Sequence, residues 1–186
     1  FELARSRNKK KKLASITKSN AQGYGMVLWD DVFDEVAKDY PDIETESLLV
    51  DAACMNFIRR PDSFDVVVGS NLFGDILTDI GAIITGSMGL AASGNINPDR
   101  TFPSTFEPVH GSAPDIAGQG IANPLAAFLS AGMMLEHLGE QQAADALNAA
   151  CVSVLRDGEA VPRDLGGQAG TKKITDAVIG ALEARE

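Results

Sequence analysis

The chain has 186 residues, of which 45% are hydrophobic, which is enough for one globular domain or for parts of two. Its formal charge of −10 argues against a nucleic acid as a partner. No apolar stretch approaches the roughly 20 residues that span a bilayer, and no secretory leader is recognisable, so we expect a cytoplasmic protein without a membrane partner.

Basic residues are concentrated at the start of the chain. Residues 1–12 contain six lysines and arginines and a single acid, Glu2. A localisation signal or nucleic-acid patch is one interpretation of this cluster. We favour the exposed side of a helix that runs into a strand, because Phe1-Glu2-Leu3-Ala4 has helical character. This helix begins without an N-cap residue, which suggests that an upstream portion is missing.

Strand and helix patterns alternate along the chain, which predicts an α/β fold with a largely parallel sheet. The apolar run 64–69 is continuous and is predicted to be a buried strand. A helix follows it and ends near Gly86. The other predicted elements are a strand over 13–17 and helices over 29–39, 46–58, 125–138, 140–156 and 171–185.

The stretch from Gly86 to Pro124 is rich in glycine, proline and asparagine and is predicted to be mainly loop. Loops of this length in a compact protein tend to be functional. We place the boundary between two lobes near Gly86, which gives the ranges 1–85 and 86–186.

Two acids four residues apart, Asp75 and Asp79, are the most informative pair in the chain. A helical projection places them with Ala82 and Gly86 on one face, opposite an apolar face. The predicted apolar face contains Leu72, Phe73, Ile76, Leu77, Ile80, Ile83 and Ile84. Like charges at this spacing destabilise a helix slightly, and Mg²⁺ and Mn²⁺ prefer carboxylate ligands, so the pair suggests a divalent cation site. Alternatively, Asp75 complements the helix N-terminus and Asp79 is a solvated acid.

A second polar stretch, His110-Gly111-Ser112-Ala113-Pro114-Asp115-Ile116, has the composition of a nucleotide-binding loop. Its glycine permits close approach of backbone to a ligand. His110 and the later Asn123 can hydrogen-bond an adenine, and the Asp115 carboxylate suits a ribose diol while it repels a 2′-phosphate. The alternative is a turn shaped by proline and glycine.

Lys18 follows the first predicted strand. Desolvation and a nearby metal could lower the pKa of a lysine there enough for it to act as a base, although most lone lysines are surface residues. The glycine cluster 166–170 lacks the spacing of a dinucleotide-binding fingerprint and is a weak signal by itself.

Several of these stretches together resemble the metal-dependent β-decarboxylating hydroxyacid dehydrogenases, the family of isopropylmalate, isocitrate, homoisocitrate and tartrate/D-malate dehydrogenases. The resemblance covers nearly the whole chain. It implies an isocitrate/isopropylmalate dehydrogenase-like α/β fold that is incomplete, because the N-terminal half of the family is absent. The motifs that carry it are Ser15-Ile16-Thr17-Lys18-Ser19-Asn20, Val50-Asp51-Ala52, Gly69-Ser70-Asn71-Leu72-Phe73-Gly74-Asp75-Ile76-Leu77-Thr78-Asp79, Glu107-Pro108-Val109-His110-Gly111-Ser112-Ala113-Pro114-Asp115-Ile116 and Asp164-Leu165-Gly166-Gly167.

The resemblance also implies a homodimer with a shared active site. Asp75 and Asp79 of one subunit and Asp51 of the other would hold Mg²⁺ or Mn²⁺, while Lys18 and Asn20 from the neighbouring subunit would help to deprotonate the substrate hydroxyl. Residues 1–85 would be part of the smaller, dimer-forming domain, and residues 86–186 part of the larger, NAD-binding domain. NAD is expected rather than NADP, because Asp115-Ile116 stands where NADP-preferring isocitrate members carry basic or aromatic residues.

The implied activity is oxidative decarboxylation of a small 2-hydroxy acid. The stretch 93–107 is longer than in typical isopropylmalate dehydrogenases and is similar to the tartrate/D-malate branch, so a malate-type acid is expected. The first alternative is 3-isopropylmalate. The second is a non-catalytic nucleotide-binding or dimerisation module, because the absent half normally carries the arginines that bind the substrate carboxylates.

Overall fold

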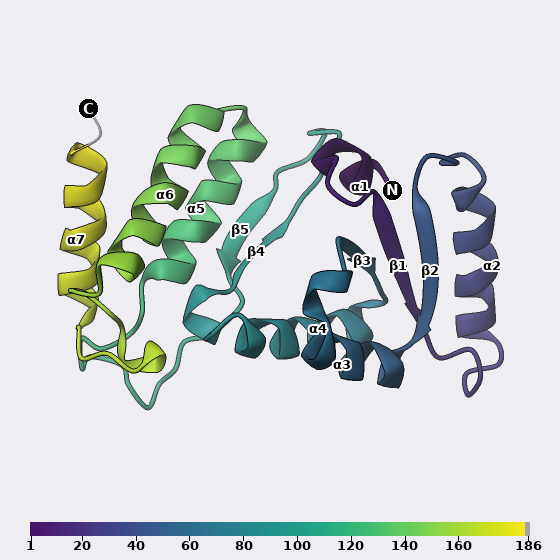
Figure 1. Cartoon of the computed structure of the whole chain (residues 1–186), viewed down its shortest axis with the longest axis horizontal. Helices are drawn as coiled ribbons and strands as arrows, with labels where there is room; N and C mark the ends of the chain where they lie inside the picture. Colours follow the sequence, from purple (N-terminus) through teal and green to yellow (C-terminus); the bar gives the residue numbers. More distant parts are fainter. Residues whose placement is uncertain (185–186) are drawn as a thin grey trace. The chain divides into compact units, whose positions relative to one another are not determined.

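The computed structural model describes residues 1–184, which form two compact units, Phe1–Ile84 and a second one that begins at Thr85 (Figure 1). The first unit contains a three-stranded sheet of order β2-β1-β3 in which both pairings are parallel. Its elements are α1 (Glu2–Arg7), β1 (Lys12–Thr17), α2 (Gly25–Ala37), β2 (Glu44–Leu49), α3 (Val50–Arg59), the 3₁₀ turn η1 (Pro61–Ser63), β3 (Val66–Val68) and α4 (Asn71–Ile84).

The central strand β1 is buried on both faces, as is usual for a parallel strand between helical layers. Ala14 and Ile16 pack in a cluster with residues of α3 and α4. The alternate residue Leu13 packs with Phe33 of α2 and with Ala4 of α1. Because successive strand residues point to opposite faces, this one strand anchors helices on both sides of the sheet.

The prediction of a helix over 46–58 is wrong at its start. Residues 44–49 form β2, which pairs with β1 in the register Lys12↔Glu44 to Thr17↔Leu49, and the helix begins only at Val50. Lys12 lies 2.7 Å from a carboxylate oxygen of Glu46 and 3.3 Å from one of Glu44. Pairing with a distant strand has overridden the local helical pattern.

The strand predicted over 64–69 is shorter and less buried than expected. Strand β3 has only three residues, each half-buried. Among the described residues it pairs with β1 alone, so it is an edge strand. An edge position explains the exposure that the continuous apolar run did not predict.

Helix α4 has the predicted extent but a different buried face. Phe73 and Leu77 of the predicted apolar face are buried, and so is Ala82, which lies two turns after Asp75 on the face of the two acids. Leu72 and Ile83, which belong to the predicted apolar face, are 63% and 67% exposed. The projection identified the apolar residues correctly but could not tell which of them this chain covers.

The second unit is an antiparallel hairpin with three helices. Apolar positions spaced three or four residues apart along the helices form most of its core, which includes Leu125, Cys151, Ile174 and Val178. The elements are η2 (Met88–Leu90), β4 (Ala92–Asn95), β5 (Thr105–Pro108), α5 (Leu125–Leu138), α6 (Gln141–Asp157), η3 (Arg163–Leu165) and α7 (Thr171–Glu183).

The sequence prediction missed the β4–β5 hairpin, because these four-residue strands lie within a stretch of turn-forming residues. The three long helices agree with the prediction within about one residue at most ends. The predicted end of the last helix, residue 185, lies outside the described residues.

Neither cysteine forms a disulfide: Cys54 is half-buried and Cys151 is buried. Burial raises the pKa of the Cys151 thiol to about 11, so it stays protonated at neutral pH. Within residues 1–184, no helix combines the length and apolar character required to cross a membrane.

Candidate active site and nucleotide cavity

The polar residues of the first unit lie where its parallel strands end. Lys18 directly follows β1, Asp51 is in the first turn of α3 after β2, and Asp75 is in the helix that follows β3. The carboxyl ends of parallel strands meet at one edge of a sheet, which is the usual ligand position in α/β proteins. The fold therefore brings these motifs to the same edge.

Lys18 and Asp51 are in direct contact. The Lys18 Nζ donates a hydrogen bond to Asp51 Oδ1 at 2.5 Å. This hydrogen bond is the main reason why the pKa of the Asp51 carboxyl is lowered. Asn20 lies exposed in the turn that follows Lys18. The structure thus joins two residues that are 33 positions apart in the sequence.

Asp75 and Asp79 are both exposed on α4, one helical turn apart. Two carboxylates at this spacing are suitable oxygen ligands for Mg²⁺ or Mn²⁺, and their exposure leaves room for water and for further ligands. However, residues 1–184 contain no group of three His, Cys, Asp or Glu side chains that could hold a metal ion. The donor set fits a divalent cation only if further oxygen ligands come from outside this chain.

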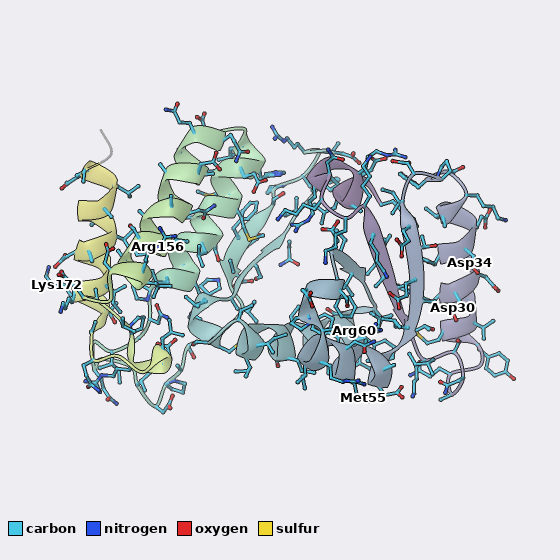
Figure 2. All side chains as sticks on the ribbon, in the orientation of Figure 1. Asp30, Asp34, Met55, Arg60, Arg156 and Lys172 are labelled. Atoms are coloured by element: carbon cyan, nitrogen blue, oxygen red, sulfur yellow. The ribbon has the colours of Figure 1, made fainter. Side chains whose placement is uncertain are left out.

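Large apolar side chains are exposed on the same helix and on its neighbour. Ile58 on α3 and Leu72, Ile76 and Ile83 on α4 are between 45% and 67% exposed. Figure 2 shows Met55 on the outer side of α3, and it too is exposed. Helices α3 and α4 pack against each other, so these residues belong to adjoining surfaces.

The second unit contains a cavity of about 890 Å³, within the size range of small-molecule sites. Six of the seven residues predicted to bind the cofactor line it. Residues from η2, from the loop over 117–122, from η3 and from the start of α7 complete the wall. The six predicted residues are His110, Gly111, Ser112, Ala113, Ile116 and Asn123.

Glycines shape the cavity wall. Gly118 and Gly120 have φ of +77° and +66°, a conformation that L side chains rarely adopt. A Cβ atom at Gly170 would lie 2.7 Å from the Gly120 carbonyl oxygen. This close approach lets Thr171 donate backbone and hydroxyl hydrogen bonds to the carbonyls of Gly120 and Ala122.

The seventh predicted residue, Asp115, is exposed and is not part of the cavity wall. Its backbone carbonyl accepts a hydrogen bond from the Gln119 side chain at 2.8 Å. A ribose would have to extend beyond the enclosed wall to reach the Asp115 carboxylate. The neighbouring Ile116 does line the cavity.

Residues 1–178 match the family described as isocitrate/isopropylmalate dehydrogenase. The chain belongs to this family. It is 49% identical over 182 residues to a probable tartrate dehydrogenase/decarboxylase of Agrobacterium vitis, an alignment that covers 98% of this chain and 50% of that protein. It is 51% identical over 178 residues to a 3-isopropylmalate dehydrogenase of Novosphingobium aromaticivorans, with 94% and 50% covered.

Among solved structures, the crystal structure of isocitrate dehydrogenase from Methylococcus capsulatus superposes with a TM-score of 0.93 at 42% identity. The superposition covers 97% of this chain and 53% of the other. The chain spans about half the length of the curated relatives it matches. Its fold is therefore part of the isocitrate/isopropylmalate dehydrogenase fold.

Several residues that line the cavity are not among the cofactor-binding residues predicted from the sequence. Ser87, Met88, Gly89, Arg163, Asp164 and Thr171 also line the cavity. Asp164 was noted only as part of a motif, and the glycine cluster after it was judged weak. The available signal is the succession of Asp164 and three glycines just before a helix.

Proposed function

We propose that this chain belongs to an NAD- and divalent-metal-dependent enzyme that oxidatively decarboxylates a malate-type 2-hydroxy acid, with an active site shared by two copies of the chain. The contact between Lys18 and Asp51 carries this proposal. Lys18 and Asp51 form a hydrogen bond within one chain. Asp75 and Asp79, in contrast, have no third acidic side chain among the described residues that could complete a metal site with them. A second copy that supplies its Lys18 and Asp51 would complete the site.

The exposed apolar surface of α3 and α4 supports an association between copies. Helix α4 carries Leu72 and Ile76 close to the two acids, so a copy that covers these side chains would also approach Asp75 and Asp79. Burial of such side chains favours association. The acids would then lie near the edge of the covered surface, where a small acid can still enter.

In the proposed reaction, Asp75 and Asp79 of one copy and Asp51 of the other hold the cation, and Asn20 helps to orient Lys18. Bound cofactors supply a hydride acceptor and a Lewis acid. Lys18 takes the proton from the substrate 2-hydroxyl while the hydrogen on the same carbon leaves as hydride. The resulting keto acid then loses the β-carboxylate as CO₂, and the electron pair of the broken bond forms an enolate that a proton quenches.

We assign the cavity of the second unit to the adenosine part of NAD. Its volume and its largely backbone and apolar lining suit a nucleoside. His110 and Asn123 bring polar groups to the wall. The preference for NAD over NADP depends on Asp115, whose negative charge disfavours a 2′-phosphate.

The substrate assignment depends on the stretch between β4 and β5, which is similar to that of the tartrate/D-malate branch. The structure fastens this stretch to α5: the Arg100 guanidinium donates a hydrogen bond to the His137 carbonyl, and the Ser104 hydroxyl shares a hydrogen bond with His137 Nε2 at 3.3 Å. The similarity to a 3-isopropylmalate dehydrogenase makes 3-isopropylmalate the second candidate.

Turnover assays on the full-length protein test the proposal. With Mn²⁺ and NAD, we expect reduction of NAD with D-malate or tartrate and release of CO₂, and much slower turnover of 3-isopropylmalate. Faster turnover of 3-isopropylmalate would establish the second candidate. An intact mass near 19.6 kDa without turnover of any of these acids would instead indicate a non-catalytic nucleotide-binding or dimerisation module.

A further inference from the structure

Asp164 joins three separate segments of the cavity wall. Its Oδ2 accepts a hydrogen bond from the Ser87 hydroxyl and another from Asn123 Nδ2 at 3.0 Å. Ser87 Oγ in turn accepts the Gly89 N–H at 2.9 Å. All four residues line the cavity. One carboxylate oxygen therefore links residues that are 41 and 77 positions away from it.

This arrangement fixes the amide of Asn123 at both ends. Its oxygen accepts the Leu125 N–H at 2.9 Å, at the start of α5, while its nitrogen donates to Asp164. The oxygen and nitrogen cannot exchange places without loss of both bonds. One N–H of the side chain is not used by these two bonds, so Asn123 can donate a hydrogen bond to a ligand in the cavity that it lines.

Gly89 is part of the same arrangement. A Cβ atom at this position would lie 2.4 Å from Asp164 Oδ2 and 2.6 Å from Asn123 Nδ2. Such distances are far below van der Waals contact, so any side chain at Gly89 would push the two partners apart. The absence of a side chain here is a condition for the bond between Asp164 and Asn123.

We propose that Asp164 is a positioning residue that holds Asn123 as a donor toward the base of the bound nucleotide and so selects adenine. Adenine presents an acceptor, N1, on its Watson–Crick edge, whereas hypoxanthine presents an N–H at the same position. A fixed donor matches the first and opposes the second. The inference rests on the proposed function, in which the cavity binds the adenosine part of NAD.

Calorimetric titration of the full-length protein with NAD and with nicotinamide hypoxanthine dinucleotide tests this role. We expect the unsubstituted protein to bind NAD at least about tenfold more tightly, the value of one hydrogen bond. In Asp164→Ala the ratio of the two dissociation constants should fall toward one, because only the Leu125 bond then orients the amide. In Asp164→Asn the ratio should stay close to that of the unsubstituted protein, because an amide oxygen can accept both hydrogen bonds.

Gly89→Ala should push Asp164 and Asn123 apart without removing a hydrogen-bonding group. The ratio of the two dissociation constants should therefore fall in this variant as well. Asp157→Ala and Gly180→Ala are the matched controls: both residues are exposed, and a Cβ at Gly180 would meet no atom within 4 Å. Both controls should keep the ratio of the unsubstituted protein.

The ratio separates a positioning role from a merely structural one. Equal weakening of both dinucleotides in Asp164→Ala and Gly89→Ala, with an unchanged ratio, would overturn the inference and leave the proposed function intact. No binding of either dinucleotide by the unsubstituted protein would overturn both. Should Asp164→Ala fail to fold, the ratio in Gly89→Ala decides the question.

Discussion

The two units present their candidate sites in opposite ways. In the first unit, the acids of α4 are exposed, their neighbouring apolar side chains are uncovered, and no third acid joins them within the described chain. In the second unit, loops from four parts of the same chain enclose a cavity and fasten one another by hydrogen bonds. The proposed site of the first unit would need a second copy, whereas all residues that line the cavity of the second unit come from one chain. A second, differently substituted copy should therefore be able to restore activity lost by a substitution in the first unit. It should not be able to do so for a substitution in the second unit.

The largest effect is expected from Asp75→Asn. Substitution of residues that merely support a metal ligand costs about 10- to 100-fold in metal affinity or activity, so the loss of a proposed ligand should lower kcat/KM by at least about a hundredfold. The fold should persist, because Asp75 is exposed. Steady-state kinetics across a Mn²⁺ titration, with circular dichroism as the control, measure this. Undiminished turnover after treatment with a chelator would refute the metal assignment.

Mixing two inactive variants tests the dependence on a second copy. Lys18→Ala retains the α4 acids, and Asp75→Asn retains Lys18 and Asp51, so each mixed dimer should contain one intact site. At equal concentrations and with free exchange, random pairing restores about a quarter of the unsubstituted activity. Native mass spectrometry verifies that mixed dimers form. If mixed dimers form but show no activity, Lys18 and Asp75 act within one copy. The site of the first unit would then not depend on a second copy.

A change of cofactor preference tests the second unit, where no compensation by another copy is expected. Asp115→Lys combined with Ile116→Tyr should shift the ratio of kcat/KM for NAD and NADP toward NADP. Removal of a like charge about 4 Å from a 2′-phosphate is worth about 1 to 4 kcal/mol, which corresponds to a fivefold to several-hundredfold change. Because Asp115 lies outside the cavity wall, a shift at the lower end is expected. An unchanged ratio would show that Asp115 does not contact the ribose.

The smallest effect concerns stability within the first unit alone. Arg5 donates two hydrogen bonds to the Asp42 carboxylate, at 2.6 and 3.1 Å, and these are the main reason why the pKa of Asp42 is lowered. A lowered carboxyl pKa stabilises the folded state above its unfolded value of about 3.9, and this contribution disappears as the pH falls through the folded pKa. Asp42→Asn should lower Tm by at most about 4 °C at pH 7, because the pair is exposed.

Hydrogen exchange can assign that effect to one unit. Asp42→Asn should reduce amide protection in α1 and β2 at pH 7, and the difference from the unsubstituted protein should shrink as the pH falls below about 3.9 and through the lowered pKa of Asp42. Amides of α5, α6 and α7 should not change. Equal loss of protection in both units would mean that they unfold together.

The sequence revealed the long helices and the central strand because their patterns are local. The segment 125–138, for example, has mainly helix-forming residues, and a glycine follows its end, so no distant partner is needed to predict it. Residues 44–49 were mistaken for helix, because their strand exists only through pairing with β1. The exposure of Leu72 and Ile83 also escaped prediction, since periodicity identifies apolar positions but not what covers them.

The candidate sites were predictable to the extent that their chemistry is carried by single motifs. His110 and Asn123 were recognised by side-chain type, and both line the cavity. Asp164 was not singled out, because its importance comes from hydrogen bonds to residues 41 and 77 positions away. The contact between Lys18 and Asp51 likewise depends on two parallel strands ending at the same edge.

The central position of β1 also dictates the order in which the first unit assembles. Both partner strands follow it in the chain, and β3 ends only at Val68, about 50 residues after β1. During synthesis, Leu13 and Ile16, which are almost fully buried in the folded protein, must therefore wait for strands and helices that have not yet emerged. Parallel pairing of this kind is non-local and slow. Strand β1 therefore pairs with β2 and β3 only some time after it has emerged, and it is where we expect a nascent chain to need a chaperone.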